Sequence, residues 1–200
     1  MRAATAILVS LLVAAAGAVA SSTTIGQNAL NTLTPIDQVP TKEQIDEAFL
    51  HDGAQPPLQS LVSIATDTEA DIGIRLRAIH ALAKYCTTTP CASADSAHSS
   101  VAEVVGVTAS ANQGSSVLLL RAAIETLGTM KVSTDVTVLE PLLEHPSRDI
   151  RAATARALRD LCNTHAITPL RSRYSVELTD QVKLSISEAL RILGQCSANP

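Results

Sequence analysis

A helical pattern of apolar residues recurs four times along the chain and constrains its fold more than any other feature. In the clearest copy, residues 149–161 (DIRAATARALRDL), apolar or small residues recur at the three- and four-residue spacings of one helix face. Leucines at equivalent positions of the four copies are separated by 45, 31 and 32 residues. They are Leu82, Leu127, Leu158 and Leu190. This period predicts stacked helical hairpins, because a single hairpin cannot bury its apolar face alone.

Each copy is expected to be a leading helix followed by a trailing helix. The longer first interval indicates an insertion loop at residues 87–100. Thr41 and Gln44 form a capping-box pattern, which predicts an N-terminal capping helix reaching about residue 50. Strand-like alternation between turns is absent, so the expected fold class is an all-α solenoid over residues 41–196. The helix pairs are expected at 58–65 and 72–85, 101–109 and 116–127, 136–144 and 149–161, and 167–174 and 180–193.

The repeats resemble HEAT repeats of the short bacterial type. The resemblance covers residues 57–194 and is weakest in the second unit. It is carried by Leu142-Leu143, Pro146, Asp149-Ile150-Arg151 and Ala157-Leu158. It implies a HEAT-like α-solenoid whose trailing helices line the concave side. It also implies a ladder in which a basic residue early in each trailing helix pairs with a nearby acid. The matching positions are Arg75 with Asp67 or Asp71, Arg151 with Asp149 or a neighbour's carboxylate, and Lys183 with Asp180 or Glu177, with interruptions at Leu120 and His145.

Residues 1–20 have the composition of a signal peptide. Met1-Arg2 gives a positive start, an apolar run follows at 5–16, and Ala18-Val19-Ala20 supplies the small residues of a cleavage site. The run is shorter than the roughly 20 residues that a membrane span needs. We therefore expect cleavage before Ser21, export to the periplasm or the exterior, and no stable membrane insertion afterwards; the alternative is a buried N-terminal helix. Residues 21–40 are expected to be an extended segment, and 197–200 a tail.

Four cysteines in an exported chain favour two disulfide bonds. Two of the cysteines end successive trailing helices, which run side by side in a solenoid, and the other two flank the start of the insertion. We therefore predict the pairs Cys162–Cys196 and Cys86–Cys91. The alternative is a zinc site combining Cys86 and Cys91 with His80 or His98, but this spacing matches no zinc pattern.

The sequence contains no G-x-S-x-G, H-E-x-x-H or phosphate-binding loop, so we expect no catalytic residues, no metal and no cofactor. His51 and His145 fall in predicted turns, where a surface histidine is expected.

A polar row occupies equivalent positions of the four trailing helices, two residues before each anchor leucine: His80, Glu125, Arg156 and Glu188. One interpretation is a structural ladder of weak, solvated pairs. The other is a recognition surface. The bases Arg77, Lys84, Arg121, Arg159 and Arg191 lie near the row and would add positive charge to that surface.

The formal net charge is −4, and removal of Arg2 makes it −5, which argues against a general nucleic-acid binder. Charge is uneven, however: Lys42 is the only base between residues 21 and 74, against eight acids, whereas from residue 145 onward eight bases face five acids. We expect an exported, monomeric, non-catalytic protein-interaction module or scaffold of the bacterial cell envelope, with an acidic partner or head-to-tail self-association as a hypothesis. The alternatives are an enzyme or accessory subunit with a site near 87–100, and a purely structural envelope protein.

Overall fold

The computed structural model describes residues 25–35, 39–53 and 56–196. The expected signal peptide at 1–20 and the tail at 197–200 lie outside these residues. None of the helices within these ranges combines the length and the apolar character that crossing a membrane requires.

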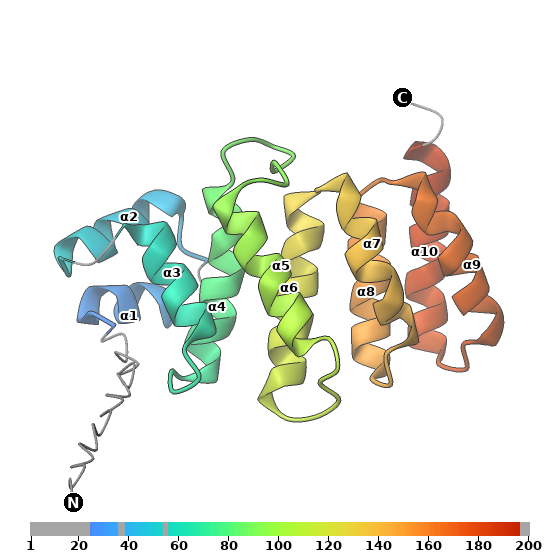
Figure 1. Cartoon of the computed structure of the whole chain (residues 1–200), viewed down its shortest axis with the longest axis horizontal. Coiled ribbons are helices and arrows are strands. Elements are labelled where there is room, and N and C mark those ends of the chain that lie inside the picture. The colour runs from blue at the N-terminus through green and yellow to red at the C-terminus, as the bar shows by residue number, and fades with distance from the viewer. Residues whose placement is uncertain (1–24, 36–38, 54–55, 197–200) are drawn as a thin grey trace, which may run out of the picture.

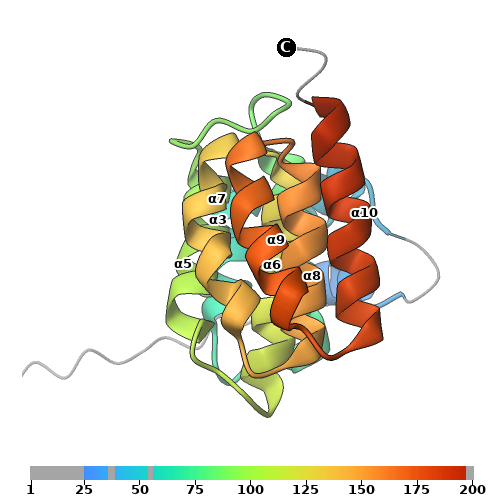
Figure 2. The same ribbon diagram turned by 90° about the vertical axis from the view of Figure 1, so that its right-hand side faces the viewer.

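The helices stack in two layers along one axis, with α3, α5, α7 and α9 in one layer and α4, α6, α8 and α10 in the other (Figures 1 and 2). The described residues contain no strand, which confirms the expected all-α solenoid of helical hairpins. The helices are α1 (Gln27–Leu33), α2 (Lys42–His51), α3 (Pro57–Thr66), α4 (Ile72–Leu82), α5 (Ser96–Thr108), α6 (Ser115–Met130), α7 (Val136–Leu139), α8 (Arg148–Asp160), α9 (Ile167–Val176) and α10 (Asp180–Cys196), with 3-10 turns η1 (Ala83–Tyr85), η2 (Ser133–Asp135), η3 (Glu140–Glu144) and η4 (Thr164–Ala166).

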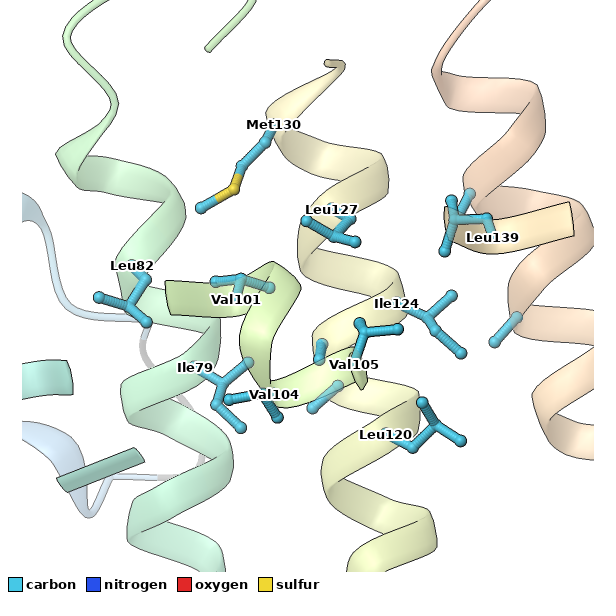
Figure 3. Close-up of a cluster of buried hydrophobic side chains, with 14 of the residues drawn as sticks. Ile79, Leu82, Val101, Val104, Val105, Leu120, Ile124, Leu127, Met130 and Leu139 are labelled. Atoms are coloured by element: carbon cyan, nitrogen blue, oxygen red, sulfur yellow. The ribbon is translucent and has the colours of Figure 1, made fainter. Parts of the chain in front are cut away.

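The predicted apolar stripes form the core between the layers. Figure 3 shows side chains of α4, α5, α6 and α7 meeting in one such cluster. Ile79, Leu120, Ile124 and Leu127 are fully buried there. In α8 the residues between the large apolar side chains are mostly alanines, which allows α6 and α10 to pack closely on both sides of it.

The helix expected at 136–144 is interrupted. α7 ends at Leu139, and the chain continues as the 3-10 turn η3. Pro141 stands near the start of η3. Because proline has no backbone N–H and crowds the preceding turn, it ends the regular α-helical hydrogen bonding at this point.

Gly128 lies where α6 approaches α8 closely. A Cβ atom placed on it would lie 3.0 Å from the Cα of Ala157. We therefore expect Gly128→Ala to lower the free energy of unfolding by about 1–2 kcal/mol, since overpacking costs more than the gain in helix propensity returns. Urea denaturation measures this change. Gly106→Ala in α5 is the matched control: a Cβ there meets nothing within 4 Å, so the variant should gain up to about 1 kcal/mol. Equal effects at the two glycines would contradict the close approach.

The expectation of an extended segment at 21–40 is wrong for residues 27–33, which form α1. The helix begins because Asp52, at the end of α2, accepts hydrogen bonds from its first N–H groups: Asn28 N lies 3.2 Å from Oδ1 and Ala29 N lies 2.8 Å from Oδ2. Ala29 and Leu33 are buried against the first repeat. The capping residue lies more than 20 residues along the chain, so the local sequence carried no sign of it. The predicted capping box of α2 is present, with the backbone N–H of Thr41 donating to Gln44 Oε1 at 2.8 Å.

The insertion expected at 87–100 is a loop only as far as Asp95, because residues 96–100 belong to α5. The loop is tied down at several points. The backbone N–H of Cys91 donates to the carbonyl of Met130 at 2.9 Å, and Asp95 accepts hydrogen bonds from the backbone and the hydroxyl of Thr87. These hydrogen bonds hold the loop to the end of α6 and to its own residues.

The cysteines lie at bonding distance in the two predicted pairs. Cα atoms are 5.1 Å apart in Cys86–Cys91 and 5.7 Å apart in Cys162–Cys196. The second pair joins the end of α10 to the end of α8. It thus connects the fourth repeat to the third.

Candidate functional site

The residues of the predicted polar row lie on neighbouring helices of one layer. His80 is on α4, Glu125 on α6, Arg156 on α8 and Glu188 on α10, and each of these helices packs against the next. The five nearby bases lie on the same four helices or, in the case of Lys84, on the adjoining turn η1. We call the outer surface of this layer, defined by these nine residues, the trailing-helix face.

Glu125 is the centre of the ion pairs on this face. Its Oε1 lies 2.9 Å from Nε of Arg121 on the same helix and 3.7 Å from Nη2 of Arg156 on α8. The Glu125–Arg156 step of the predicted ladder is therefore present. Both side chains keep about a third of their surface exposed, so these pairs stabilise the fold only weakly.

The ladder does not continue to α10. Glu188 pairs instead with Arg191 of its own helix, at 2.7 Å, and no ion pair joins it to Arg156 in the part of the chain that the structure describes. The hydrogen bond from Arg191 holds the pKa of Glu188 below its ordinary value. Arg159 pairs with Asp160 at 2.7 Å.

His80 has a defined proton arrangement. The hydroxyl of Thr126 donates to the carbonyl of Ala122 at 2.8 Å and therefore accepts from Nδ1 of His80 at 3.2 Å. Nε2 of His80 has no hydrogen-bond partner among the described residues. Partial burial lowers the pKa of His80, while Glu125 acts in the opposite direction and Arg121 reinforces the decrease. The ring is thus mainly neutral near pH 7, with Nε2 free to accept a hydrogen bond or to take up a proton.

A pocket of about 280 Å³ lies at the N-terminal end of the trailing-helix face. It forms where Leu33, Pro35, Val39 and Pro40 lie beside α4. Arg77 holds the end of α1 there: its Nη1 donates to the carbonyl of Leu33 at 2.7 Å and also to that of Pro35. The lining consists of Leu33, Pro35, Val39, Pro40, Arg77, His80, Ala81 and Lys84. Three of the predicted site residues therefore meet at one place, which we call the N-terminal pocket.

A cluster of charged side chains outside the predicted row links repeats three and four. Arg151 donates from Nε and Nη2 to both carboxylate oxygens of Glu177, at 2.8 and 3.0 Å. Arg173 also donates to Glu177 and reaches Glu144 at 2.6 Å. These bonds, first of all the one from Arg151, hold the pKa of Glu177 far below its ordinary value. We call Arg151, Arg173, Glu177 and Glu144 the inter-repeat ion network.

Only the Arg151 step of the ladder implied by the resemblance is confirmed, through a neighbour's carboxylate. Arg75 donates from Nε to the carbonyl of Ala65 at 3.3 Å, and Asp71 is instead occupied at the start of α4, where it accepts from Gly73 N at 2.8 Å. Neither Arg75 nor Lys183 takes part in an ion pair within the described residues. An aspartate that caps a helix has its lone pairs directed at backbone N–H groups, so it is no longer placed for the arginine.

The expectation that His145 lies at the surface is wrong. His145 is 5% exposed, donates from Nε2 to the carbonyl of Ala111 at 2.8 Å and accepts from Ser147 N at Nδ1. It thereby links the turn within repeat three to the turn within repeat two. A turn histidine gives no sequence sign of being buried, because the covering residue lies 34 positions away.

Sequence reasoning also missed a buried histidine–aspartate pair. Nε2 of His98 lies 2.9 Å from each carboxylate oxygen of Asp135, and Nδ1 donates to the carbonyl of Ser93. Burial raises the pKa of Asp135, although the hydrogen bond with His98 opposes this increase. The pair connects the start of α5 to the turn before α7. Both ring nitrogens of His98 are thus occupied by hydrogen bonds. The described residues contain no cluster of three metal-ligating side chains.

Comparison with known proteins matches the second to fourth repeats to a family. A family model described as HEAT repeats matches residues 106–191, from within α5 to within α10. No curated protein and no solved structure matches the chain.

Proposed function

We propose that this HEAT-like α-solenoid is a non-catalytic protein-interaction module of the bacterial cell envelope, which binds its partner through the trailing-helix face. The observation that carries the proposal is the alignment of polar and charged side chains across α4, α6, α8 and α10 on one continuous layer. HEAT repeats are generally protein-interaction scaffolds. A solenoid suits this role because its stacked repeats offer an extended surface without an enclosed cleft.

The ion pairs of the trailing-helix face can be replaced by pairs with a partner's carboxylate. Arg121 and Arg156 share the single carboxylate of Glu125, and their side chains are 48% and 35% exposed. Opening such exposed pairs costs little free energy. An incoming carboxylate can therefore take over a guanidinium without a large penalty, and arginine holds carboxylates in a bidentate manner. This favours a partner with an acidic surface.

The proposed location rests on two features. The first is the sequence pattern of residues 1–20, and the second is the placement of all four cysteines in pairs at bonding distance, which is compatible with an oxidising compartment. Fractionation of cells that express the tagged chain should place it in the envelope or the medium, with an N-terminus at Ser21. Recovery of the uncut chain in the cytoplasm would contradict this part of the proposal.

Reversal of one charge on the face tests the binding role. We expect Arg156→Glu to reduce capture of the partner from the native envelope fraction by about tenfold or more, because it removes a positively charged donor to a carboxylate and adds a repelling charge. Crosslinking followed by quantitative mass spectrometry measures the captured protein.

The matched control is Arg148→Glu, which makes the same change of charge at a 66% exposed position on α8 outside the row. Capture should persist in this variant and should weaken as salt rises from about 0.05 to 0.5 M. Equal capture by both variants, or capture that does not respond to salt, would remove the trailing-helix face from the proposal.

A further inference from the structure

The N-terminal pocket has apolar walls that are not fully covered by the protein. Leu33, Pro35, Val39, Pro40 and Ala81 supply these walls. Leu33 and Ala81 are buried, whereas Val39 is 80% exposed. At about 280 Å³ the pocket is close to the lower end of the size range of small-molecule sites, roughly 300–1,000 Å³. It can therefore cover a small apolar group.

The remaining lining residues are all basic. Arg77, His80 and Lys84 come from successive turns of α4 and η1, and no acidic side chain lines the pocket. Lys84 forms no ion pair with any carboxylate of the described residues. Glu125 acts electrostatically on His80, and that carboxylate is already shared by Arg121 and Arg156. Positive charge at this end of the face is thus left without a partner.

The three basic side chains can offer hydrogen-bond donors to an anion. The two backbone carbonyls bound to Arg77 Nη1 fix its guanidinium and leave Nε and Nη2 without a partner among the described residues. His80 donates from Nδ1 to Thr126, so a proton taken up by the ring resides on Nε2 and makes a second donor. Lys84 adds up to three donors.

We propose that the N-terminal pocket binds a monocarboxylate with an apolar body, whose carboxylate is held by Lys84 and His80 and whose body packs against the proline and valine side chains. This chemistry is shared by a free fatty or aryl acid and by the C-terminal residue of a peptide that ends in an apolar side chain. The inference deepens the proposed function, since the pocket belongs to the trailing-helix face, and its peptide form rests on that function.

Binding of defined probes to the purified protein tests the proposal. Isothermal titration compares decanoate with decanol, and a hexapeptide ending in leucine with the same peptide as its C-terminal amide. We expect at least one of the two carboxylates to bind and its neutral counterpart to bind about tenfold more weakly or worse, because a charged hydrogen bond is lost. Binding of decanoate alone identifies a free acid as the source, and binding of the peptide acid alone identifies a peptide end.

Two variants locate the site. Lys84→Met should weaken binding of the carboxylate about tenfold, whereas Lys183→Met on α10, at the far end of the same layer, should not. Affinity should rise as the pH falls from about 8 to 6, because a bound carboxylate favours the proton on His80 Nε2. This pH dependence should persist in Lys84→Met and vanish in His80→Gln. The charged groups that face His80 are Glu125 and Arg121 of α6, with Arg77 and Lys84 on its own side.

Equal binding of the acids and their neutral counterparts, equal affinity in the two lysine variants, or no binding by the wild type would overturn the proposal. These outcomes are separable from those of the partner-capture experiment, since Arg156 does not line the pocket. Loss of probe binding with intact capture rejects the carboxylate site alone. Loss of the response to Arg156→Glu with intact probe binding rejects the proposed protein-binding role of the face alone.

Discussion

Replacing Glu177 with glutamine is expected to lower the free energy of unfolding by about 3–5 kcal/mol, the range for breaking a buried ion pair by neutralising one partner. Glu177 is 2% exposed and receives hydrogen bonds from Arg151, from Arg173 and from the backbone N–H of Thr179 at 2.9 Å. Glutamine keeps the shape of the side chain but leaves the arginines without their shared negative charge. Urea or thermal denaturation measures the loss.

The effect of Glu177→Gln should depend on pH with a defined sign. The arginines lower the pKa of Glu177 in the folded state, so its contribution to stability is fully present above the unfolded pKa of about 4.3 and is lost as the pH falls towards the folded value. The stability difference between wild type and variant should therefore be constant from about pH 7 to 5 and shrink as the pH falls towards 2. A difference that stays constant over the whole range would show that the carboxylate charge is not responsible.

Glu144→Gln provides the control within the same inter-repeat ion network. Glu144 bonds to Arg173 at 2.6 Å, but its side chain is 67% exposed. Exposed pairs contribute little, so the expected loss is below about 1 kcal/mol. If the two variants lose the same stability, burial of Glu177 does not determine the energetics of the network.

Joint replacement of Cys162 and Cys196 by serine is expected to lower the free energy of unfolding by about 3–4 kcal/mol. The pair closes a loop with a sequence separation of 34 residues, and the chain-entropy model assigns this amount to a bridge across such a loop. The loss should fall mainly on the fourth repeat, because in the described part of the chain α10 packs on one neighbouring trailing helix, α8. Hydrogen exchange should therefore speed up in α9 and α10 more than in α6.

The Cys86–Cys91 pair offers the matched comparison. Its sequence separation is five residues, so the same model gives about 2 kcal/mol. The Cys86→Ser/Cys91→Ser variant should accordingly be more stable than the Cys162→Ser/Cys196→Ser variant. The reverse order would mean that the loop 86–95, with its bonds to Met130 and within itself, contributes more than chain entropy allows.

Helix pairing was predictable because the information is local and repeated. Leu82, Leu127 and Leu158 recur in the same phase of a 3.6-residue period, and each marks a fully buried position. Residues in equal phase on stacked helices lie side by side. The same reasoning put His80, Glu125 and Arg156 in one row, and the expectation that successive trailing helices run side by side placed Cys162 next to Cys196.

Partners across repeats were decided by the tertiary structure alone. Arg151 meets Glu177 over a separation of 26 residues, and His98 meets Asp135 over 37. A polar residue type does not reveal whether its site is buried, since that depends on which turn of the next repeat covers it. His145 in a turn and His51 near a helix end look alike in sequence, yet only the first is covered.

The sequence by itself determined that this chain is a stack of helical hairpins with its cysteines in two pairs. Helical periodicity and repeat phase can be read from it because they depend on residues that are close together in the sequence. The tertiary structure decided where charge is buried, where α1 begins and how Leu33, Pro35, Val39 and Pro40 come to line a basic pocket beside α4. Those features depend on the capping of α1 by Asp52 and on the bonds of Arg77 to the carbonyls of Leu33 and Pro35, contacts that exist only once the first repeat has folded.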